Sequence, residues 1–363
     1  MGIKSSFNNF LRNECPQIFE EIHISEYAYK LIAIDISLYL NKYKAIAGDN
    51  WKALFLKLIS SLRRNQIHCV FIFDGKSPPE KEEERKKRRN ERQKIEKNVF
   101  DLEQSLEKYH QTQEVEQILL DLSNKKKSRL LSPKKPLFDI NWIEDKIKQK
   151  RAQLYQIYPE DYDNVKKLFD ILKVPYYTAP WEAEKMCAKL NIDGYVDAVL
   201  SEDTDLMAYN TPVFLSKIDT SKDTCIRIKK EFLLESLELD EKMFLDLCIM
   251  CGTDYNDNIP RIGSKTAYKH IKKFSNIENF AFNTGYEIEI LKHLRVRELF
   301  CDFEDYNINK IPYCGQPNFI ELEKFIKENK IYIDFVKIKN DFTLNILIFE
   351  DNQEEDKIII SDS

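Results

Sequence analysis

Residues 176–205 read YYTAPWEAEKMCAKLNIDGYVDAVLSEDTD and place four carboxylates around one helix and one short apolar run. The apolar run at residues 196–200 predicts a buried strand, and acidic side chains follow it directly. In extended chain Asp203 and Asp205 point to the same side, because alternate residues share a face. Open α/β sheets bind ligands beyond the carboxyl ends of their strands, so this pair is a candidate for metal binding.

Glu182 and Glu184 lie at the start of the helix in this stretch. Residues two apart on a regular helix do not share a face, so both could serve one site only from an irregular first turn after Pro180. The alternative is that glutamates in a first turn merely complement the helix dipole. Further acidic residues at other strand ends favour the metal site.

Two more apolar runs lead to aspartates, at residues 31–36 (LIAIDI) and at residues 69–73 (CVFIF). The segment between them, residues 51–64, has leucines at four-residue spacing and predicts an amphipathic helix. Strand, helix and strand in this order predict a parallel pair, which would bring Asp35 and Asp74 to one edge of the sheet. A single aspartate at a strand end is more often only a turn or cap residue.

The composition is that of a globular protein, with 363 residues, of which 43% are hydrophobic and 32% charged. No run of 18 apolar residues and no signal-peptide core occurs, so we expect an intracellular protein without a membrane span. Residues 350–363 hold six acids and one lysine, a balance of −5, which equals the whole net charge of −5. Acids gathered at a metal site would leave basic surface on the neutral remainder to meet phosphates.

Eight cysteines are scattered along the chain without a regular framework, which is typical of reduced thiols in an intracellular protein. Cys248 and Cys251 form the only close pair. Because no second Cys or His pair follows at zinc spacing, we favour buried thiols over a zinc site.

A basic segment follows Pro79 and reads KEEERKKRRNERQKIEK at residues 81–97. On a helix its basic residues would form one stripe, with members Lys81, Arg85, Arg88 and Arg92. We prefer phosphate binding to a merely solvated face, because Asp74 is close in the sequence. Residues 100–122 and 141–158 predict two antiparallel helices that project from the main body. The basic stretch at residues 125–136 is a nuclear-localisation patch, a DNA contact or a plain loop.

The α/β pattern resumes with a helix at residues 162–172 and strands at residues 174–177 and 213–215, and a helix follows at residues 243–251. Residues 259–274, IPRIGSKTAYKHIKKF, resemble a helix-hairpin-helix turn, in which backbone N–H groups hold a phosphate. Its candidate contacts are Gly263, Ser264, Lys265 and Lys269.

Gly2 has two interpretations. MGIKSS fits the N-myristoylation pattern, but no polybasic segment or second lipid site accompanies it. We favour the alternative, in which a residue without a side chain allows close backbone approach at an active site.

Together these segments resemble the flap endonuclease and XPG-type 5′ nuclease family. The motifs are MGI (1–3), IAIDIS (32–37), FIFDGKSPPEK (71–81), APWEAEKMCA (179–188), LSEDTDLMAY (200–209) and CGTDYNDNIPRIGSKTA (251–267). Six motifs in the family's order are far more specific than any one of them. The resemblance extends to roughly residue 330.

The resemblance implies two magnesium ions, for which we expect Mn²⁺ to substitute. It places Asp35, Asp74 and Glu184 around one ion and Asp203 and Asp205 around the other, with Glu182 and Asp254 acting through water. Lys81 and Arg88 fall where the family keeps basic residues that contact the reacting phosphate. Arg85 and Arg92 would extend this contact along the DNA. Carboxylates suit hard divalent cations, and a metal pair can activate water and stabilise a leaving oxygen.

Some positions depart from the family pattern. Arg261 replaces the first glycine of the hairpin turn, which puts the family's potassium ion in doubt. Asn41 stands where the family has an aromatic that stacks on the substrate, so Tyr39 or Tyr43 would have to replace it. The loop near Gly48 is short, which weakens a pocket for a 3′ flap, and no sliding-clamp motif is visible near the acidic end.

We therefore predict an α/β fold with a mainly parallel sheet, an inserted helical arch and a helix-hairpin-helix module. The expected segments are a nuclease domain in two parts (1–94 and 161–250), the arch (95–160), the hairpin region (251–345) and an acidic tail (346–363). The expected activity is magnesium-dependent hydrolysis of DNA at 5′ flaps, nicks and junctions, as flap endonuclease, 5′–3′ exonuclease or both. The alternatives are a Holliday-junction or bubble endonuclease of this family and an inactive DNA-binding module. We expect the nucleus, or the cytoplasm where the host system replicates DNA there.

Overall fold

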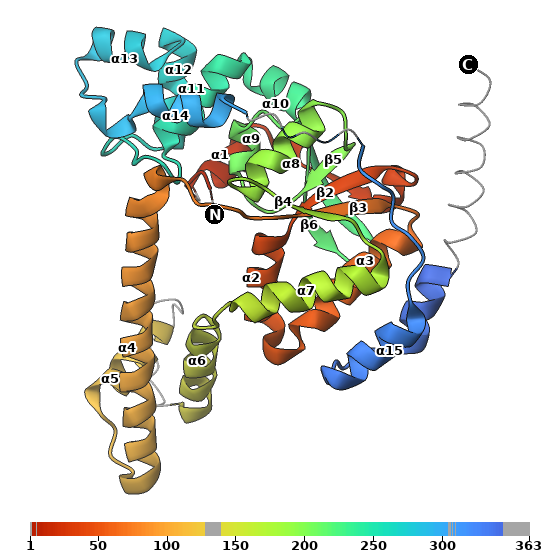
Figure 1. Ribbon diagram of the computed structural model, residues 1–363. Helices are drawn as coiled ribbons and strands as arrows, with labels where there is room; N and C mark the ends of the chain where they lie inside the picture. The colour runs from red at the N-terminus through yellow and green to blue at the C-terminus, as the bar shows by residue number, and fades with distance from the viewer. Residues whose placement is uncertain are drawn as a thin grey trace, which may run out of the picture.

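The computed structural model describes residues 2–4, 6–127, 139–303 and 310–343, together with 306 and 308. A seven-stranded sheet in the order β1-β7-β6-β5-β2-β3-β4 forms its centre (Figure 1). The strands are β1 (Glu20–His23), β2 (Leu31–Asp35), β3 (His68–Phe73), β4 (Tyr176–Thr178), β5 (Ala198–Leu200), β6 (Val213–Asp219) and β7 (Thr224–Lys229). Strands β2 to β6 pair in parallel, whereas β7 is antiparallel to both β6 and β1. The predicted class, α/β with a mainly parallel sheet, is confirmed.

Helices surround the sheet and extend away from it. They are α1 (Ser6–Glu14), α2 (Ile36–Ala47), α3 (Trp51–Arg64), α4 (Glu82–Thr112), α5 (Gln117–Lys127), α6 (Ile140–Ala152), α7 (Pro159–Leu172), α8 (Ala183–Ile192), α9 (Asp205–Ala208), α10 (Lys230–Leu237), α11 (Glu241–Cys251), α12 (Ser264–Phe274), α13 (Ile277–Thr284), α14 (His293–Cys301) and α15 (Phe319–Glu328). Among the residues that the structure describes, no helix is both long and apolar enough to span a bilayer.

The two faces of the sheet bury separate apolar cores, because successive side chains of a strand point to opposite faces. Ala33 and Val70 face a core shared with α1, α8, α10 and α11. Ile34 and Phe71 face a second core shared with α2, α3, α7 and α15. Strands buried on both faces read as continuous apolar runs, which is why β2 and β3 could be predicted from the sequence.

Several predicted elements differ from those observed. The strand expected at residues 174–177 is β4 at Tyr176–Thr178, because Pro175 cannot donate a backbone hydrogen bond to a neighbouring strand. The helix expected at residues 100–122 is interrupted after Thr112, where Gln113 takes a positive φ of 62°. β1, β7 and α1 lie outside the predicted elements. β1 and β7 are short strands, and α1 has Phe7, Phe10 and Leu11 at helical spacing over only nine residues, which is a brief signal.

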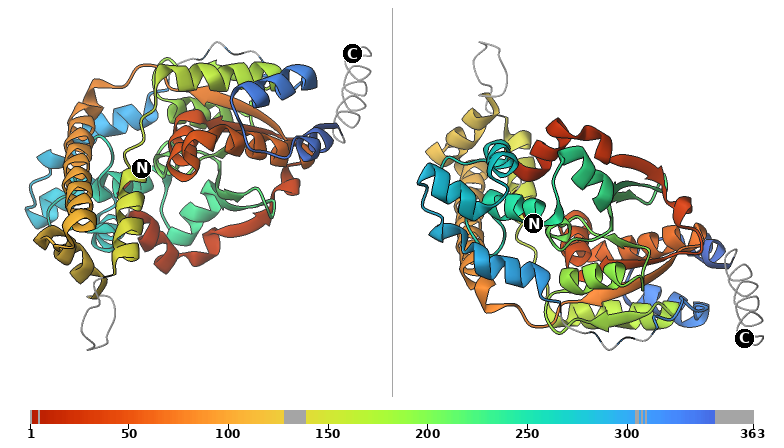
Figure 2. Two further views of the ribbon diagram at one scale, coloured as in Figure 1. Left: turned by 90° about the horizontal axis from the view of Figure 1, so that it is seen from below. Right: turned by 90° about the horizontal axis from the view of Figure 1, so that it is seen from above.

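The expected helical projection is present and has a small core of its own. α4 has 31 residues and carries α5 and α6 beside its far half, on the side of the molecule opposite α15 (Figures 1 and 2). The core of the projection consists of Leu102, Leu119, Leu122, Ile143 and Ile147. Most of the basic stretch expected at residues 125–136 lies outside the described residues, as does the acidic tail.

Candidate metal centre

Predicted acidic ligands gather at the carboxyl edge of the sheet, where the strand order reverses between β2 and β5. Asp35 ends β2 and caps α2, accepting a hydrogen bond from the N–H of Ser37 at 2.9 Å. Asp74 follows β3 and accepts one from the N–H of Ala183 at 2.8 Å, which ties the end of β3 to the start of α8. Both aspartates therefore position helix starts as well as facing the site.

The start of α8 directs its two glutamates to different places. Glu182 is the N-cap residue, and Glu184 lies in the first turn. One carboxylate oxygen each of Glu184, Asp203 and Asp205 lies within 4.8 Å of the others. Asp203 also accepts a hydrogen bond from the N–H of Asp205 at 3.0 Å, which fixes this acidic pair after β5. The two glutamates do not share one face, as helical geometry requires.

The acidic cluster lies in the protein interior, and Lys81 compensates only part of its negative charge. Burial raises the pKa of Asp35, Glu184 and Asp205 well above the usual carboxyl range. Asp203 raises all three further, because nearby like charges disfavour ionisation. Glu184 Oε2 and both carboxylate oxygens of Asp205 are buried without a hydrogen-bond partner. A divalent cation would satisfy these oxygens and remove the repulsion, so the donor set fits Mg²⁺.

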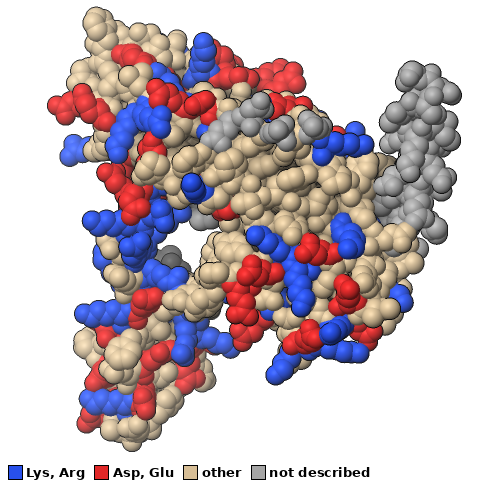
Figure 3. Space-filling view, viewed as in Figure 1, with Lys and Arg blue, Asp and Glu red and all other residues tan. Residues whose placement is uncertain are grey.

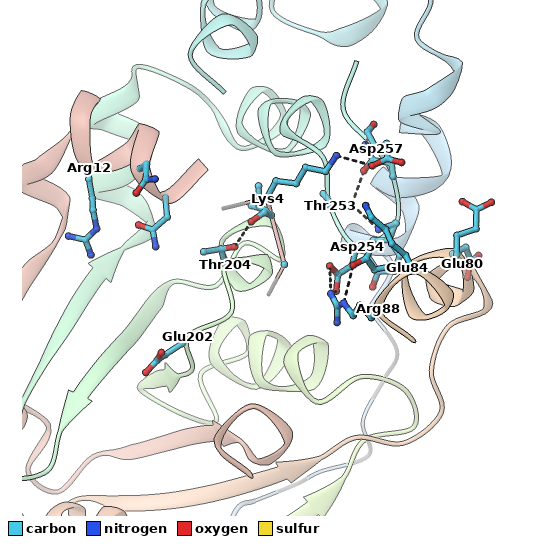
Figure 4. Close-up of a pocket in the computed structure, with 18 of the residues that line it drawn as sticks. Lys4, Arg12, Glu80, Glu84, Arg88, Glu202, Thr204, Thr253, Asp254 and Asp257 are labelled. Atoms are coloured by element: carbon cyan, nitrogen blue, oxygen red, sulfur yellow. Dashed lines mark hydrogen bonds and ion pairs between the residues drawn. The ribbon is translucent and has the colours of Figure 1, made fainter. Parts of the chain in front are cut away.

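The backbone of Gly2 packs directly on this cluster. Its φ is +83°, and a Cβ at this position would lie 2.0 Å from Asp203 Oδ1 and 2.7 Å from the backbone nitrogen of Asp205. The neighbouring chain is tied down by Thr204, whose hydroxyl donates to the carbonyl of Ile3 at 3.2 Å (Figure 4). Only glycine fits both the conformation and the space, as expected for close backbone approach at a site.

Lys81 enters the site from a 3-10 turn (Pro79–Lys81) before α4, so it does not belong to the helical stripe in which we expected it. It is buried, and its Nζ lies 2.6 Å from Glu182 Oε1 and 3.5 Å from Asp254 Oδ2. Burial by itself lowers its pKa, but the surrounding carboxylates, Glu184 first among them, outweigh burial and leave the pKa well above the usual lysine value. The ammonium group therefore stays charged at the rim of the cluster.

Two tyrosines that the sequence analysis did not name support Glu182. The hydroxyl of Tyr255 donates to Glu182 Oε2 at 2.5 Å, and the hydroxyls of Tyr209 and Tyr255 lie 2.8 Å apart. Burial raises the pKa of both tyrosines, so both remain neutral donors. Their signal in the sequence is their place inside two of the motifs, directly after Asp254 and four residues after Asp205.

Arg88 joins the first part of α4 to the segment after α11. Its Nη2 contacts Asp254 Oδ1 and Oδ2 at 2.8 and 2.9 Å, and its Nε donates to Glu84 at 3.0 Å (Figure 4). Lys4 makes a neighbouring ion pair with Asp257 at 2.8 Å. These residues line a pocket of about 800 Å³ beside the acidic cluster. The pocket brings basic side chains to the edge of the candidate metal centre.

The other two arginines of the expected stripe lie farther along α4. Arg85 is exposed, and its Nη1 forms an ion pair with Glu82 Oε2 at 3.3 Å. Arg92 donates through Nη2 to the carbonyl oxygens of Leu154 and Tyr155 at 2.7 and 2.8 Å. Its guanidinium is thus engaged with the chain that follows α6. Figure 3 shows Lys and Arg side chains gathered along α4, beside an opening between α4 and the body.

The hairpin candidates surround the start of α12. Gly263 is the N-cap residue, Ser264 is buried, and the carbonyl of Gly263 accepts hydrogen bonds from the N–H groups of Thr266 and Ala267 at 3.0 and 2.9 Å. Lys265 lies 3.3 Å from Glu14, and Lys269 is exposed on the same helix. Arg261 takes a positive φ of 67°, a conformation that suits glycine better.

Neither tyrosine considered as a stacking platform is available on the surface. Tyr39 is fully buried and Tyr43 is 7% exposed, and both belong to the core beneath α2. Asn41 instead accepts a hydrogen bond at its Oδ1 from the hydroxyl of Tyr155 at 3.1 Å. Cys248 and Cys251 are free buried thiols, as predicted.

The arrangement combines carboxylates that can bind hard cations with two cations poised at their rim. Lys81 and Arg88 both contact acids of the site, so a phosphodiester brought to that rim would meet positive charge on one side and the metal-binding acids on the other. Such a site suits hydrolysis of a phosphate ester, in which negative charge builds up on oxygen atoms.

Comparisons with known proteins agree with this chemistry. The model of the XPG N-terminal domain matches residues 1–95, and that of the XPG I-region matches residues 173–254. "Probable RAD2-like endonuclease 369L" of Invertebrate iridescent virus 6 is 32% identical over 94% of this chain and 92% of the relative. Flap endonuclease 1 of Cryptosporidium parvum is 29% identical over 78% of this chain and 56% of the relative.

Solved structures share the fold. The catalytic core of Rad2 in complex with a DNA substrate covers 93% of this chain and 99% of its own, with a TM-score of 0.64 and 18% identity. Flap endonuclease-1 from Methanococcus jannaschii covers 93% of this chain and 98% of its own, with a TM-score of 0.60 and 20% identity. The chain therefore belongs to the XPG/Rad2 family of structure-specific nucleases.

Proposed function

We propose that this chain is a magnesium-dependent 5′ nuclease that hydrolyses DNA phosphodiesters at 5′ flaps and junctions. The observation that supports this most is the set of buried, unpartnered carboxylate oxygens of Glu184 and Asp205 at the switch point of the sheet. Two bound magnesium ions would supply an activated water and stabilise the leaving oxygen. Mn²⁺, which accepts the same oxygen ligands, would replace Mg²⁺.

The residues of the site would have separate roles in binding the metal ions and the phosphate. Asp35, Asp74, Glu184, Asp203 and Asp205 would hold the ions directly. Glu182 and Asp254, which already contact Lys81, would act from farther out through water. Lys81 and Arg88 would leave these acids for the scissile phosphate, where their charge counts most in the transition state.

Duplex DNA would be held through its backbone. The first turn of α12, with Gly263 and Ser264, would bind one phosphate by its N–H groups, and Lys265 and Lys269 would add charge. Arg85 would contact the strand near the acidic cluster. We do not include a potassium ion at the hairpin, because Arg261 replaces the glycine there.

A substrate panel tests this function. Single-turnover cleavage of a 5′ flap, a nick, a bubble and a four-way junction would be compared in Mg²⁺, with Asp203→Ala as the control variant. We expect the flap to be cut fastest, and the variant to bind it in Ca²⁺ without cutting it. Faster cleavage of the bubble or the four-way junction would replace the proposal with the junction-resolving alternative. Binding without any metal-dependent cleavage would leave a DNA-binding module.

A further inference from the structure

Two cysteines from distant parts of the chain meet at the amino end of β3. Cys69 is the second residue of this strand, and Cys314 lies in the segment that leads to α15. Their Sγ atoms are 4.0 Å apart, although 245 positions separate them in the sequence. Both side chains are buried, with exposed fractions of 0% and 3%. Because Asp74 follows the other end of β3, this cysteine pair and the acidic cluster lie at opposite edges of the sheet.

Backbone contacts hold Cys314 beside the strand. Its N–H donates to His68 Nδ1 at 3.0 Å, and the N–H of Cys69 donates to Cys314 Sγ at 3.4 Å. The N–H of the next residue, Gly315, donates to the carbonyl of Lys173 at 2.8 Å. A Cβ on Gly315 would lie 2.9 Å from Lys173 Cβ, so the two segments are closely packed. The two sulfur atoms are therefore held side by side as free thiols.

The surroundings make Cys314 the more acidic thiol of the pair. The hydrogen bond from Cys69 lowers the pKa of Cys314 most, burial opposes this, and His68 and Arg63 lower it further, which leaves it well below the usual thiol range. The pKa of Cys69 is raised, first by the same hydrogen bond and then by burial. Burial also raises the pKa of the other six cysteines. Because the thiolate is the nucleophilic form, Cys314 is the reactive member of the pair.

We propose that Cys69 and Cys314 are a reversible disulfide site, which hydrogen peroxide oxidises and which then ties the segment before α15 covalently to β3. In the first step the Cys314 thiolate attacks one peroxide oxygen, the O–O bond breaks, and the hydroxide that leaves takes up a proton as water. Cys314 is then a sulfenic acid. In the second step the sulfur of Cys69 attacks the sulfur of Cys314, the S–O bond breaks, and the departing hydroxide takes the Cys69 proton as a second water. The two thiols are oxidised, and one peroxide is reduced to two waters.

Burial selects the oxidant. Tyr313, which is 40% exposed, stacks on His68 with the ring centroids 4.2 Å apart and lies next to Cys314 in the chain. Small local motions admit a molecule of two oxygen atoms, whereas a mixed disulfide with a tripeptide such as glutathione requires the segment to open. A small dithiol reverses the reaction when the segment opens. The site is independent of the proposed nuclease function, because it shares no residue with the acidic cluster.

The disulfide would stabilise the folded protein. Joining residues that are 245 positions apart restricts the unfolded chain strongly, since the entropy removed grows with the length of the closed loop. The cross-link would also keep α15 on the sheet, because α15 begins only a few residues after Cys314. Its Leu322 and Phe325 belong to the core beneath β3.

Peptide mapping of the folded wild type tests the site directly. Protein freed of reductant would be treated with hydrogen peroxide, unfolded in N-ethylmaleimide and digested without reduction. We expect one peptide pair joined through Cys69 and Cys314, with Cys248 and Cys251 alkylated as free thiols. Free thiols at both Cys69 and Cys314, or earlier formation of a Cys248–Cys251 disulfide, would overturn the proposal. Glutathione disulfide should leave Cys314 unmodified over the same period, and faster oxidation by it than by peroxide would overturn the peroxide step.

Variants separate the two steps. Cys69→Ala removes the second thiol, so Cys314 should stop at the sulfenic acid and be captured by dimedone. Cys314→Ala should leave Cys69 a free thiol, because Cys69 is the less acidic member. The matched control is Cys301→Ala, since Cys301 is exposed and has a raised pKa, and this variant should form the disulfide as the wild type does. A dimedone adduct on Cys69 in Cys314→Ala, with none on Cys314 in Cys69→Ala, would overturn the assignment of the nucleophile.

Thermal unfolding in EDTA gives a readout that needs neither activity nor metal. Oxidation should raise the Tm of the wild type and of Cys301→Ala by about 5 °C or more, and dithiothreitol should remove the gain. Cys69→Ala should show no gain, although its Tm before oxidation also reports whether the variant folds. A wild-type Tm that stays the same or falls when the disulfide has formed would overturn the inference that the cross-link fits the native structure.

Discussion

Replacing Asp205 by asparagine should make the metal-free protein more stable while abolishing its activity. Both carboxylate oxygens of Asp205 are buried and unpartnered, and carboxylates of Glu184 and Asp203 lie within 4.8 Å. At an effective dielectric of about 20, each such neighbour repels it by about 3 to 4 kcal/mol. Attraction to Lys81 offsets part of this, and so does protonation of the cluster, which leaves a net gain of about 1 to 3 kcal/mol.

The matched control is the same substitution at a buried aspartate that has partners. Asp246 is 2% exposed and accepts hydrogen bonds from Arg297 Nε and Nη2, each at 2.6 Å, and from the N–H of Ile277. Asp246→Asn should therefore lower stability by about 2 kcal/mol or more, because it removes the buried carboxylate from the ion pair with Arg297 and leaves that arginine only Glu278 as a counter-charge. The two substitutions are chemically identical and should have opposite signs.

Thermal unfolding in EDTA and in Mg²⁺ measures both effects. For a protein of this size we expect Asp205→Asn to raise the metal-free Tm by about 2 to 5 °C. Added Mg²⁺ should stabilise the wild type much more than the variant, because only the folded wild type binds the ion tightly. A fall in the metal-free Tm of Asp205→Asn comparable to that of Asp246→Asn would refute the inference that repulsion dominates in the acidic cluster. So would an undiminished response to Mg²⁺.

Three further predictions concern the site and its surroundings. Gly2→Ala should reduce single-turnover cleavage by at least about 100-fold with little change in flap binding, because its Cβ would displace Asp203; near wild-type rates would contradict the close approach. Arg88→Ala should slow cleavage more than it weakens DNA binding. Lys269→Ala should weaken DNA binding and reduce the slope of log affinity against log salt concentration by about one. Equal effects of the two variants would mean that both residues are plain phosphate contacts. Burial raises the folded pKa of Asp35, Glu184 and Asp205, so the folded metal-free protein binds more protons than the unfolded chain. Its stability should therefore fall as pH rises from the ordinary carboxyl range toward neutrality. A Tm in EDTA that rises over this pH window, or a slope of Tm against pH that Asp205→Asn leaves unchanged, would contradict this prediction.

The central strands and the positions of the acidic residues could be predicted because their signals are local. β2 and β3 are continuous apolar runs, and Asp35 and Asp74 follow from where those runs stop. Parallel pairing then places both aspartates at one edge of the sheet. The edge strand β1 could not be predicted, since it is short and largely polar and its partner β7 lies far away in the chain. β7 follows its other partner β6 across a short connection, but its own run of apolar residues is brief.

The sequence by itself thus determined the family, the sheet class and the acids that gather at its edge. Tertiary structure alone decided how the charged side chains share partners. Glu182 contacts Lys81, whereas Glu184 lies with Asp203 and Asp205. Lys81 precedes α4 instead of lying on its basic stripe, and Arg92 donates hydrogen bonds to the carbonyls of Leu154 and Tyr155. The physical reason is the sequence separation of the residues involved, because apolar periodicity depends on near neighbours along the chain. The partner of a long cationic side chain depends instead on which distant segments fold within a few ångströms of it.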